Sequence, residues 1–499
     1  MKNILHSVKL FVLGLCISVV GLTSCEETPS QPTTPSQDPD ISVEKPSAPS
    51  SSTTKSIDTR AVTYLRGLYA TSNNSAVFNA LDGKTTTAWK TTKGASPDEK
   101  VVLLFQKPTY LKKVEVLAAK GDGLADVLDF FIHINGKPFG LGGIETTEIE
   151  QEVSSLSIHI GRTGALEKIN VAEAGKNGKV IRFSKDLAVG ISEIKLWGED
   201  GNAMSVVPPR KVKATVNASS TLSPVSSYGV AHLFDNKIEY AWVEGVDGYG
   251  EDEQINFQLQ EEVDIEKIQV WNGYQRSPNH YRNNSRVKGF SLGNTTGKSY
   301  DYTLRDDDAP QMIDMKVSLE SKDFTFKINS AYEGKRYADL AVSELLFFEP
   351  TDNGFRPLQL EVVNNSVPQM ITQKSKGTLL EPLLNNRIAN EMEYTLSGFY
   401  AERSIVLRSN GTFSLSLMES VEDDDAYTSV ADGHWEIITV NGGSAQVKLS
   451  GILTDLSAML AEEQGRNEQA QVIQPFTDVL TITKDKISGE KVFDEILVR

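Results

Sequence analysis

A repeat of about 150 residues is the feature that most constrains how this chain can fold. The stretch Ala76–Trp89 reads AVFNALDGKTTTAW, and Gly229–Trp242 reads GVAHLFDNKIEYAW, so each copy has an aspartate followed at the same spacing by Ala-Trp. The two aspartates, Asp82 and Asp235, lie 153 positions apart. A period this long indicates two copies of one domain rather than a solenoid of short repeats.

The two copies also end alike, and both are typical of strands. One closes on ISEIKLW at Ile191–Trp197, and the other on VSELLFF at Val342–Phe348. Within each copy, short β-branched and aromatic runs alternate with polar turns. Asn135-Gly136 has the sequence of a two-residue hairpin turn. We therefore predict an all-β chain with two tandem β-sandwiches, each of about eight strands.

A length of 499 residues leaves room for about three domains and for segments outside them. After the second copy, the repeat is no longer visible. We expect a small, mostly-β C-terminal domain, opened by a helix at 379–393 that Pro382 interrupts, and with a further helical stretch at 454–470. Its phrases Gly411-Thr412-Phe413 and Gly433-His434-Trp435 are loosely similar to a lipocalin-like barrel. The predicted boundaries are 1–24 (signal peptide), 25–59 (tether), 60–203 (first unit), 204–350 (second unit), 351–370 (connector) and 371–499 (C-terminal domain).

The N-terminus has the pattern of a secretory signal. Lys2 and Lys9 precede the apolar run Leu10–Leu22, which is too short to span a bilayer as a mature helix. The run ends in Leu22-Thr23-Ser24-Cys25, which resembles a bacterial lipobox. The resemblance implies cleavage before Cys25 and acylation of that residue, which would anchor the chain durably in a membrane. The alternative is a plain signal peptide with an incidental cysteine. The Pro-, Ser- and Thr-rich stretch 26–59 then predicts an extended tether.

Charge and cysteine content exclude several function classes. The chain carries −17, and without residues 1–24, which hold two lysines and no acid, the remainder carries −19. Such a chain should not bind nucleic acid through phosphate contacts. The two cysteines, Cys16 and Cys25, both lie near the N-terminus. Cysteine catalysis, Cys-ligated zinc and disulfides within the domains are therefore excluded.

Several phrases carry a family resemblance. The Asp-to-Trp phrase and the closing Ser-Glu strand resemble the discoidin, or coagulation factor 5/8 type C, superfamily of galactose-binding-like jelly rolls. The second unit adds Ala241–Gly245 (AWVEG), Trp271–Tyr274 (WNGY) and Asn283–Lys288 (NNSRVK). These resemble the glycan-binding module first noted beside bacterial NAD glycohydrolases (NADase-type). The first unit has Ala118-Ala119-Lys120 in place of the Asn-Gly-Tyr phrase, which leaves its ligand role open.

The candidate glycan site lies in two loop-rich stretches of the second unit. Aromatic rings stack on the apolar faces of sugars, and Arg, Asn and Glu supply hydrogen bonds to hydroxyls. The predicted binding residues are Glu244, Tyr249, Tyr274, Arg276, Tyr281, Asn284 and Arg286. Trp242 and Trp271 are instead expected in the core. For each of the binding residues a purely structural role is the alternative.

Four acids recur at matched positions in the two units, namely Asp82, Glu193, Asp235 and Glu344. In many discoidin-like modules an aspartate and a glutamate at such positions help to hold a structural Ca²⁺, for which oxygen ligands are suited. The alternative is a turn-capping aspartate and an ordinary strand glutamate. No other cofactor is expected.

These features lead to one main hypothesis and two alternatives. The chain is expected to be a lipid-anchored lipoprotein of the bacterial cell envelope, at the outer membrane or cell surface. It would bind a glycan without catalysis, as an adhesin or capture subunit. The first alternative is an envelope scaffold that contacts a protein partner through degenerate discoidin folds. The second is an enzyme with its site in 371–499, although no catalytic motif is visible there.

Overall fold

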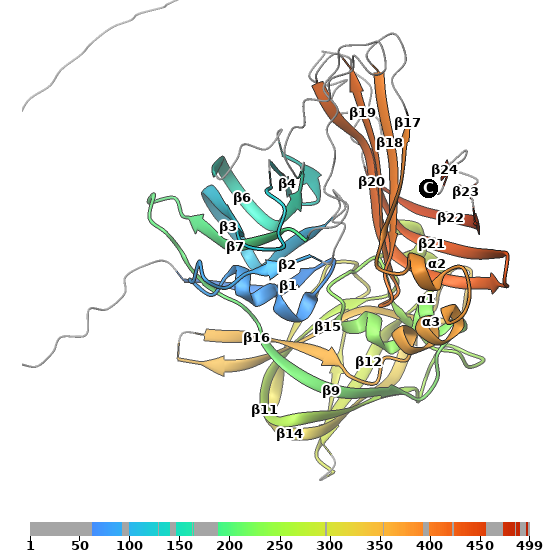
Figure 1. Cartoon of the computed structure of the whole chain (residues 1–499). Helices are drawn as coiled ribbons and strands as arrows, with labels where there is room; N and C mark the ends of the chain where they lie inside the picture. Colours follow the sequence, from blue (N-terminus) through green and yellow to red (C-terminus); the bar gives the residue numbers. More distant parts are fainter. Residues whose placement is uncertain are drawn as a thin grey trace, which may run out of the picture. The chain divides into compact units, whose positions relative to one another are not determined.

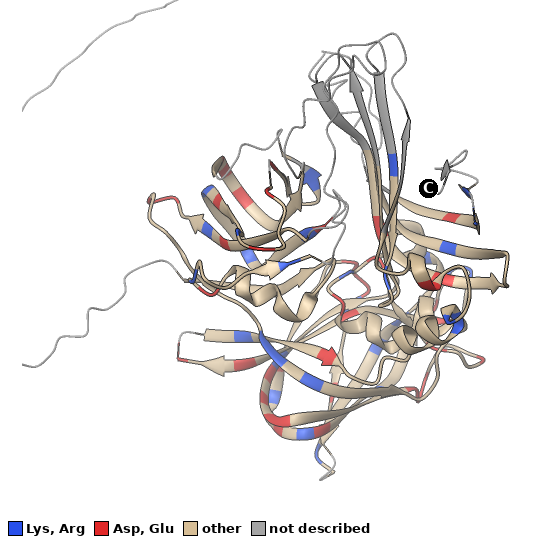
Figure 2. Cartoon of the chain, in the orientation of Figure 1, with Lys and Arg blue, Asp and Glu red and all other residues tan. Residues whose placement is uncertain are grey.

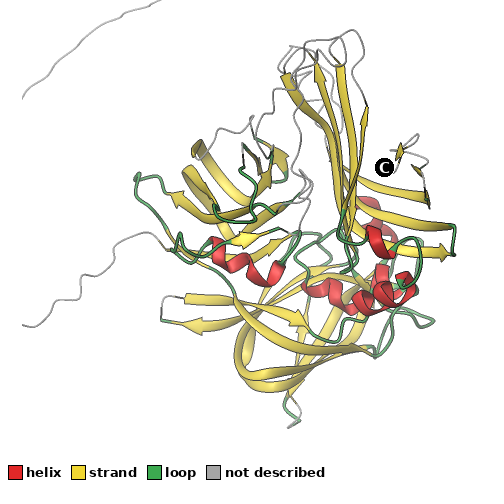
Figure 3. Cartoon of the chain, viewed as in Figure 1, coloured by secondary structure: helices red, strands yellow, loops and turns green. Residues whose placement is uncertain are grey.

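The computed structural model describes residues 62–497, apart from 92–98, 128, 140–145, 162, 164–187, 295–296, 353, 393–398, 422–423, 456–472, 485 and 490–495. The predicted signal peptide, the predicted acylation site Cys25 and the predicted tether lie outside the described residues, as does nearly all of the helix expected at 454–470. Strands dominate, and the helices are short (Figure 3). Among the described residues, no helix is both long and apolar enough to cross a bilayer.

Among its described residues, the first repeat unit consists of strands and one 3-10 helix; Figure 1 labels several of the strands. The elements are β1 (Val62–Ala70), η1 (Asn74–Ala80), β2 (Trp89–Lys90), β3 (Lys100–Ala118), β4 (Phe130–Ile134), β5 (Lys137–Pro138), β6 (Thr146–Ile160), β7 (Gly190–Trp197) and β8 (Ser205–Val207). The strand order is β2-β7-β3-β6-β4-β5, with β1 paired to both β3 and β8. Asn135 and Gly136 both have positive φ between β4 and β5, which confirms the predicted hairpin turn.

The second unit repeats this order and adds short helices. Its elements are β9 (Arg210–Ala218), α1 (Val225–Tyr228), η3 (Val230–Phe234), β10 (Trp242–Val243), β11 (Gln254–Asn272), α2 (Pro278–Asn283), β12 (Ser285–Asn294), β13 (Ser299–Thr303), β14 (Gln311–Tyr332), β15 (Leu340–Thr351) and β16 (Gly354–Val362). Strand β16 pairs in parallel with β9, as β8 does with β1. The segment expected as a connector therefore carries the last strand of the second unit.

The two units correspond strand by strand. The 19-residue strands β3 and β11 each pair at one end with the first strand of their unit and at the other end with the closing strand. One long, bent strand thus belongs to both layers of each sandwich. The register shifts occur at matched places, between Leu111 and Lys113 and between Ile265 and Lys267. The prediction of two tandem, discoidin-like β-sandwiches is confirmed.

Each unit buries one tryptophan at the same place. Trp89 and Trp242 are both fully buried, and both donate from Nε1 to a backbone carbonyl, of Ser72 (2.8 Å) and Ser220 (3.0 Å) respectively. Trp271 is also buried, beside Leu346 and Phe348. The expectation that Trp242 and Trp271 belong to the core is confirmed, and the tryptophan of the repeat phrase joins the start of each unit to its closing strand.

The C-terminal domain is an eight-stranded antiparallel meander in sequential order. Its elements are α3 (Val367–Ser375), η4 (Glu381–Leu383), β17 (Arg387–Met392), β18 (Phe399–Leu407), β19 (Thr412–Val421), β20 (Asp424–Val440), β21 (Ser444–Asp455), β22 (Ile473–Thr483), β23 (Lys486–Ser488) and β24 (Ile496–Leu497). The sequential order is that of an up-and-down sheet, the arrangement that lipocalin-type barrels share. The helix expected at 379–393 is wrong. The segment forms one 3-10 turn at Pro382, and its polar residues then enter β17.

Buried ion pairs connect the two repeat units to the meander. Arg408 pairs with Glu99 of the first unit at 2.8 Å, and both side chains are buried. Asp432 accepts from Lys100 of the first unit at 2.9 Å and from Lys237 of the second unit at 3.2 Å. Elsewhere, acidic and basic residues are interspersed over the described strands (Figure 2).

Candidate functional site

The turn that carries the repeated aspartate has the same backbone role in both units. Asp82 accepts from the amide of Lys84 at 2.9 Å, and Asp235 accepts from the amide of Lys237 at 2.8 Å. Both are Asx-type turns, as the turn-capping alternative expected. In each unit the strand glutamate, Glu193 or Glu344, lies close enough to feel the charge of the aspartate. The four acids proposed for calcium therefore do meet in pairs, and the calcium prediction stays a prediction.

The surroundings of the two glutamates differ. The pKa of Glu193 is raised, first by burial and then by Asp82. The pKa of Glu344 is raised well above its ordinary value, first by burial and then by Asp235, while Arg66 opposes the shift. In both glutamates, Oε2 is buried and has no hydrogen-bond partner within the described part of the chain.

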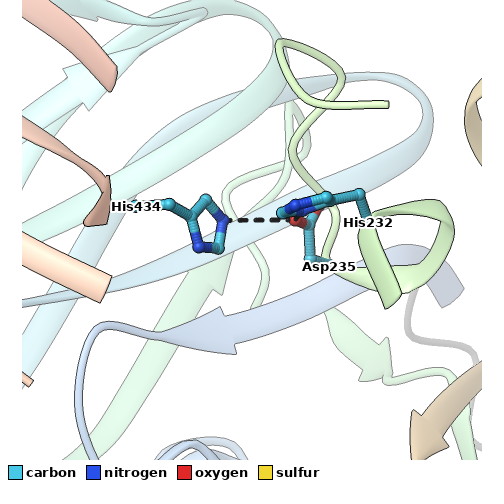
Figure 4. A group of neighbouring side chains, drawn as sticks. All are labelled: His232, Asp235 and His434. Carbon is cyan, nitrogen blue, oxygen red and sulfur yellow. Dashed lines mark hydrogen bonds and ion pairs between the residues drawn. The ribbon is translucent and has the colours of Figure 1, made fainter. Parts of the chain in front are cut away.

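Two imidazoles meet Asp235 in the second unit. His232 Nδ1 lies 2.9 Å from Asp235 Oδ2, and His434 Nε2 of the meander lies 3.4 Å from the same oxygen (Figure 4). Burial alone would raise the pKa of Asp235, but the two histidines outweigh it and the pKa is lowered. Burial lowers the pKa of His434 to about 4 although Asp235 opposes the change, so the His434 ring is neutral at physiological pH.

Three of the predicted glycan residues are held in internal contacts. The guanidinium of Arg286 is buried and binds both oxygens of Asp306, at 2.8 Å and 2.9 Å. The Tyr281 hydroxyl also donates to Asp306, at 3.1 Å. Glu244 is fully buried and accepts from the amides of Val246 and Leu340. These contacts fix the loops around the site.

The other four predicted residues fall into two groups, one residue at the surface and three in a cavity. Tyr249 is 40% exposed at the surface. Tyr274, Arg276 and Asn284 line one cavity of about 580 Å³. The structure therefore brings together three of the seven predicted side chains, and Arg286 is not among the residues that line this cavity.

Side chains of the second unit and of the meander together line the cavity. The second unit supplies aromatic and polar groups, including Tyr228, Tyr240, Tyr274, Arg276, His280, Asn284, Tyr337 and Asp339. The meander supplies His434, Trp435, Glu436, Lys448, Ser450, Pro475 and Thr477. Between the two walls, Arg276 donates to the carbonyl of Phe476 at 3.1 Å, and the Tyr240 hydroxyl donates to the carbonyl of Ser450 at 2.6 Å. We call this cavity the interdomain pocket.

The loop geometry that places these side chains follows from local sequence. Ser277 caps α2 by accepting from the amide of His280, and Pro278 fits the first turn of the helix. The short helix directs His280 and Asn284 towards the pocket lining. The pKa of Tyr274 is raised, chiefly by burial, and the pKa of His280 is lowered by burial and by Arg276. Arg276 therefore supplies a positive charge to the pocket lining beside Tyr274 and His280.

Sequence reasoning missed the whole meander wall. Lys448 and Thr477 lie about 170 and 200 positions after Tyr274 and Arg276, and nothing in their local sequence indicates contact. The one local signal is the phrase Gly433-His434-Trp435, which by itself indicates a barrel motif. Gly433 lies very close to the second unit, because a Cβ on it would lie 2.5 Å from the Tyr240 hydroxyl. The glycine permits the close approach of the two domains.

Comparisons with known proteins agree with the resemblance. Residues 209–348 match the family model described as the NAD glycohydrolase translocation F5/8 type C domain. No curated protein matches the chain.

Similar solved structures include the family 32 carbohydrate-binding module of C. perfringens NanJ in complex with galactose. It is 12% identical, with 27% of this chain and 92% of that chain covered and a TM-score of 0.22. The paired modules CBM32-1 and CBM32-2 of Clostridium perfringens ZmpB are 11% identical, covering 57% of this chain and 92% of that chain with a TM-score of 0.23.

The arabinofuranosyltransferase AftD from Mycobacteria is 9% identical with a TM-score of 0.26. The match covers 78% of this chain but spans only 38% of the length of that one. The family match confirms the discoidin-like resemblance of the second unit: over residues 209–348, this chain is similar to the F5/8 type C domain family.

Proposed function

We propose that this chain binds carbohydrate without catalysis, in the interdomain pocket, and that a lipid on Cys25 anchors it in a bacterial cell envelope. The interdomain pocket is the observation that carries the proposal. Its volume of about 580 Å³ lies within the range of small-molecule sites. Three of the seven residues predicted from the second unit, Tyr274, Arg276 and Asn284, line one wall of it.

The chemistry of the pocket suits a sugar better than an apolar or polyanionic ligand. Tyr228, Tyr274 and Tyr337 provide aromatic surface for the C–H faces of a pyranose. Arg276 and Asn284 on one wall, with Lys448 on the other, provide donors for hydroxyl groups. Glu436 and Asp339 add acceptors and balance the positive charge.

The family match supports the choice of the second unit. The resemblance of residues 209–348 to a glycan-binding module came from the loop phrases that border the pocket. The description of the matched family names translocation for its F5/8 type C domain. We accordingly take the domain to capture a ligand, as an adhesin or glycan-capture subunit would.

The anchor is a separate part of the proposal. It is supported by the run Leu10–Leu22, the lipobox-like phrase that ends in Cys25, and the Pro-rich segment that follows. Metabolic labelling with an alkyne fatty acid in a bacterial host would test it. The chain should take up label, and Cys25→Ser should abolish uptake. Equal labelling of both proteins would contradict the anchor.

The glycan proposal is tested on an array with the full chain carrying Cys25→Ser. The chain should bind a defined set of glycans, and Arg276→Ala should lose most of that signal. The matched control is Asp122→Ala, because Asp122 stands at the equivalent position of the first unit. Equal signals for both variants would contradict the site.

Two further outcomes distinguish the alternatives. No array signal, together with specific recovery of one envelope protein, would favour the scaffold. Cleavage of a bound glycan would favour an enzyme with its site in 371–499.

A further inference from the structure

We propose that His232, Asp235 and His434 form a binding site for a divalent transition metal of the zinc class, which joins the second unit to the meander. His232 lies in η3, Asp235 ends that helix, and His434 lies on β20. The three side chains point towards one another (Figure 4), and their ligand atoms all lie within 4.8 Å of one another. His434 also lines the interdomain pocket, but the metal proposal does not depend on glycan binding.

The hydrogen bond of His232 fixes which of its nitrogens can bind a metal. Nε2 lies 3.1 Å from the backbone carbonyl of Ser226, which can only accept, so Nε2 carries the proton. Nδ1 then faces Asp235 Oδ2 at 2.9 Å. A ring nitrogen that donates to a backbone carbonyl while its partner faces the metal is the usual arrangement of metal-binding histidines.

His434 provides an independent observation. Its Nε2 is buried and finds no hydrogen-bond partner in the described part of the chain, yet it faces Asp235 Oδ2 at 3.4 Å. The 3.4 Å from Asp235 Oδ2 to His434 Nε2 matches the separation of neighbouring ligands around a tetrahedral zinc with bonds of about 2.0–2.2 Å, whereas the 2.9 Å to His232 Nδ1 would have to lengthen on metal binding.

The two neighbouring lysines pair with another carboxylate, which leaves Asp235 available as a metal ligand. The cationic Lys237 is held by Asp432 at 3.2 Å, and Lys100 is held by the same carboxylate at 2.9 Å. Glu344 adds a second acid close to Asp235, with its Oε2 buried and lacking a hydrogen bond among the described residues.

The donor set selects the metal. Two imidazoles and one carboxylate suit Zn²⁺ and related transition metals, whereas Ca²⁺ and Mg²⁺ prefer oxygen ligands.

The site also differs between the two units. Asn79 stands at the position of the first unit that corresponds to His232, and Asp82 accepts from Thr87 rather than from a histidine. Asp82 is therefore the matched control for Asp235.

A bound metal would also stiffen one wall of the interdomain pocket. The Tyr240 ring stacks on His232 at 5.3 Å between centroids and meets His434 edge-on at 4.3 Å. The Tyr240 hydroxyl contacts the carbonyl of Ser450 and accepts from the amide of His434. Joining the two histidines through a metal would fix Tyr240 between them.

The test is a titration of the untagged full chain with Zn²⁺, after removal of metal by a chelator, in competition with a chromophoric zinc indicator. The chain should bind about one zinc. His434→Ala and Asp235→Asn should each weaken binding by about 100-fold or more, since loss of even a second-shell partner costs about 10–100-fold. Asp82→Asn should bind as the unchanged chain does.

A second measurement guards against misfolding of a variant. Cobalt(II) bound to the unchanged chain should show visible d–d absorption, and His434→Gln, with native circular dichroism, should lose it. Zinc uptake that persists in the folded His434→Gln, or uptake of Ca²⁺ in place of Zn²⁺, would overturn the proposal. A chain that binds no more zinc than the double variant His232→Ala, His434→Ala would do the same.

Discussion

The two repeat units have one fold and different surfaces. Both bury the tryptophan of the repeat phrase, both carry a long strand shared between two layers, and both pair a turn aspartate with a strand glutamate. Of the two units, only the second has the Asn-Gly-Tyr phrase and His232, and the short helix α2 has no counterpart among the described residues of the first. The difference teaches that the shared residues maintain the scaffold, whereas ligand chemistry depends on the loops that are not shared.

One glycine explains much of the loop difference. Gly273 has φ 72°, in the left-handed region, and a Cβ there would lie 2.8 Å from the ring of Tyr281 and 2.9 Å from Cγ of Arg286. The first unit has Ala119 at the corresponding position. The second unit can therefore pack Tyr281 and Arg286 against the backbone and turn Tyr274 into the pocket lining, which a side chain at Gly273 would prevent.

Truncating the shared tryptophans tests whether the two scaffolds are equivalent. Trp89→Ala and Trp242→Ala should each destabilise its own unit by about 3–5 kcal/mol, because each removes a fully buried ring and leaves a carbonyl unpaired. Hydrogen exchange followed by mass spectrometry would locate the loss of protection. Tyr249→Ala, at an exposed position, is the control. A cost below about 1 kcal/mol for Trp89→Ala alone would mean that the first unit does not share the scaffold of the second.

A pair of buried histidines should make the first unit sensitive to acid. Burial, aided by Lys100, lowers the pKa of His133 to about 3 from an ordinary 6.5, and the pKa of His159, 4.1 Å away between ring centroids, is also lowered. Between pH 6.5 and about pH 3, the imidazole of His133 therefore binds a proton in the unfolded chain but not in the folded chain. Stability is therefore full above pH 6.5 and is lost as pH falls towards 3.

The loss attributable to His133 should be on the order of 3 kcal/mol by about pH 4. Urea unfolding across this range, with exchange protection followed in the first unit, would measure it. His133→Phe should flatten the dependence in that unit and leave the protection of the second unit unchanged. An identical slope with and without His133 would argue against the buried neutral ring.

Arg286→Ala should cost stability rather than specificity. The buried guanidinium holds Asp306 and the carbonyl of Asn284, so its removal should destabilise the second unit by about 2 kcal/mol, a value discounted because Asp306 is 43% exposed. The urea midpoint would show this, with the exposed Arg282→Ala as the control. Full stability combined with lost glycan binding would place Arg286 in direct contact with the ligand.

The sequence predicted the features that depend on neighbouring residues better than those that depend on residues far apart in the chain. Periodicity and the Asn135-Gly136 turn predicted the strands and a hairpin, because these depend on neighbouring residues. The repeat predicted the duplication and the burial of Trp242. The helix expected at 379–393 failed, because Pro382 and the pairing of β17 with β18 override the local apolar pattern.

The sequence predicted only the wall of the interdomain pocket that the second unit supplies. Tyr274, Arg276 and Asn284 were found because their phrase resembles a known loop. Arg286 and Tyr281 have the same residue types, yet Asp306 engages both, and nothing in the sequence identified that partner. The opposite wall and His434 come from a domain whose barrel-like phrases do not indicate a partner, so their contact with the second unit depends on tertiary packing.

The central claim is that the interdomain pocket, and not the first unit, holds the glycan. The most direct measurement is calorimetric titration of the best array glycan into the full chain and three variants, each checked for native circular dichroism. Tyr274→Ala and Lys448→Ala, one on each wall, should each bind at least about tenfold more weakly. Lys120→Ala, which matches Tyr274 in the first unit, should bind as the unchanged chain does. Unaltered affinity in both folded pocket variants, or loss of affinity in Lys120→Ala, would contradict the account.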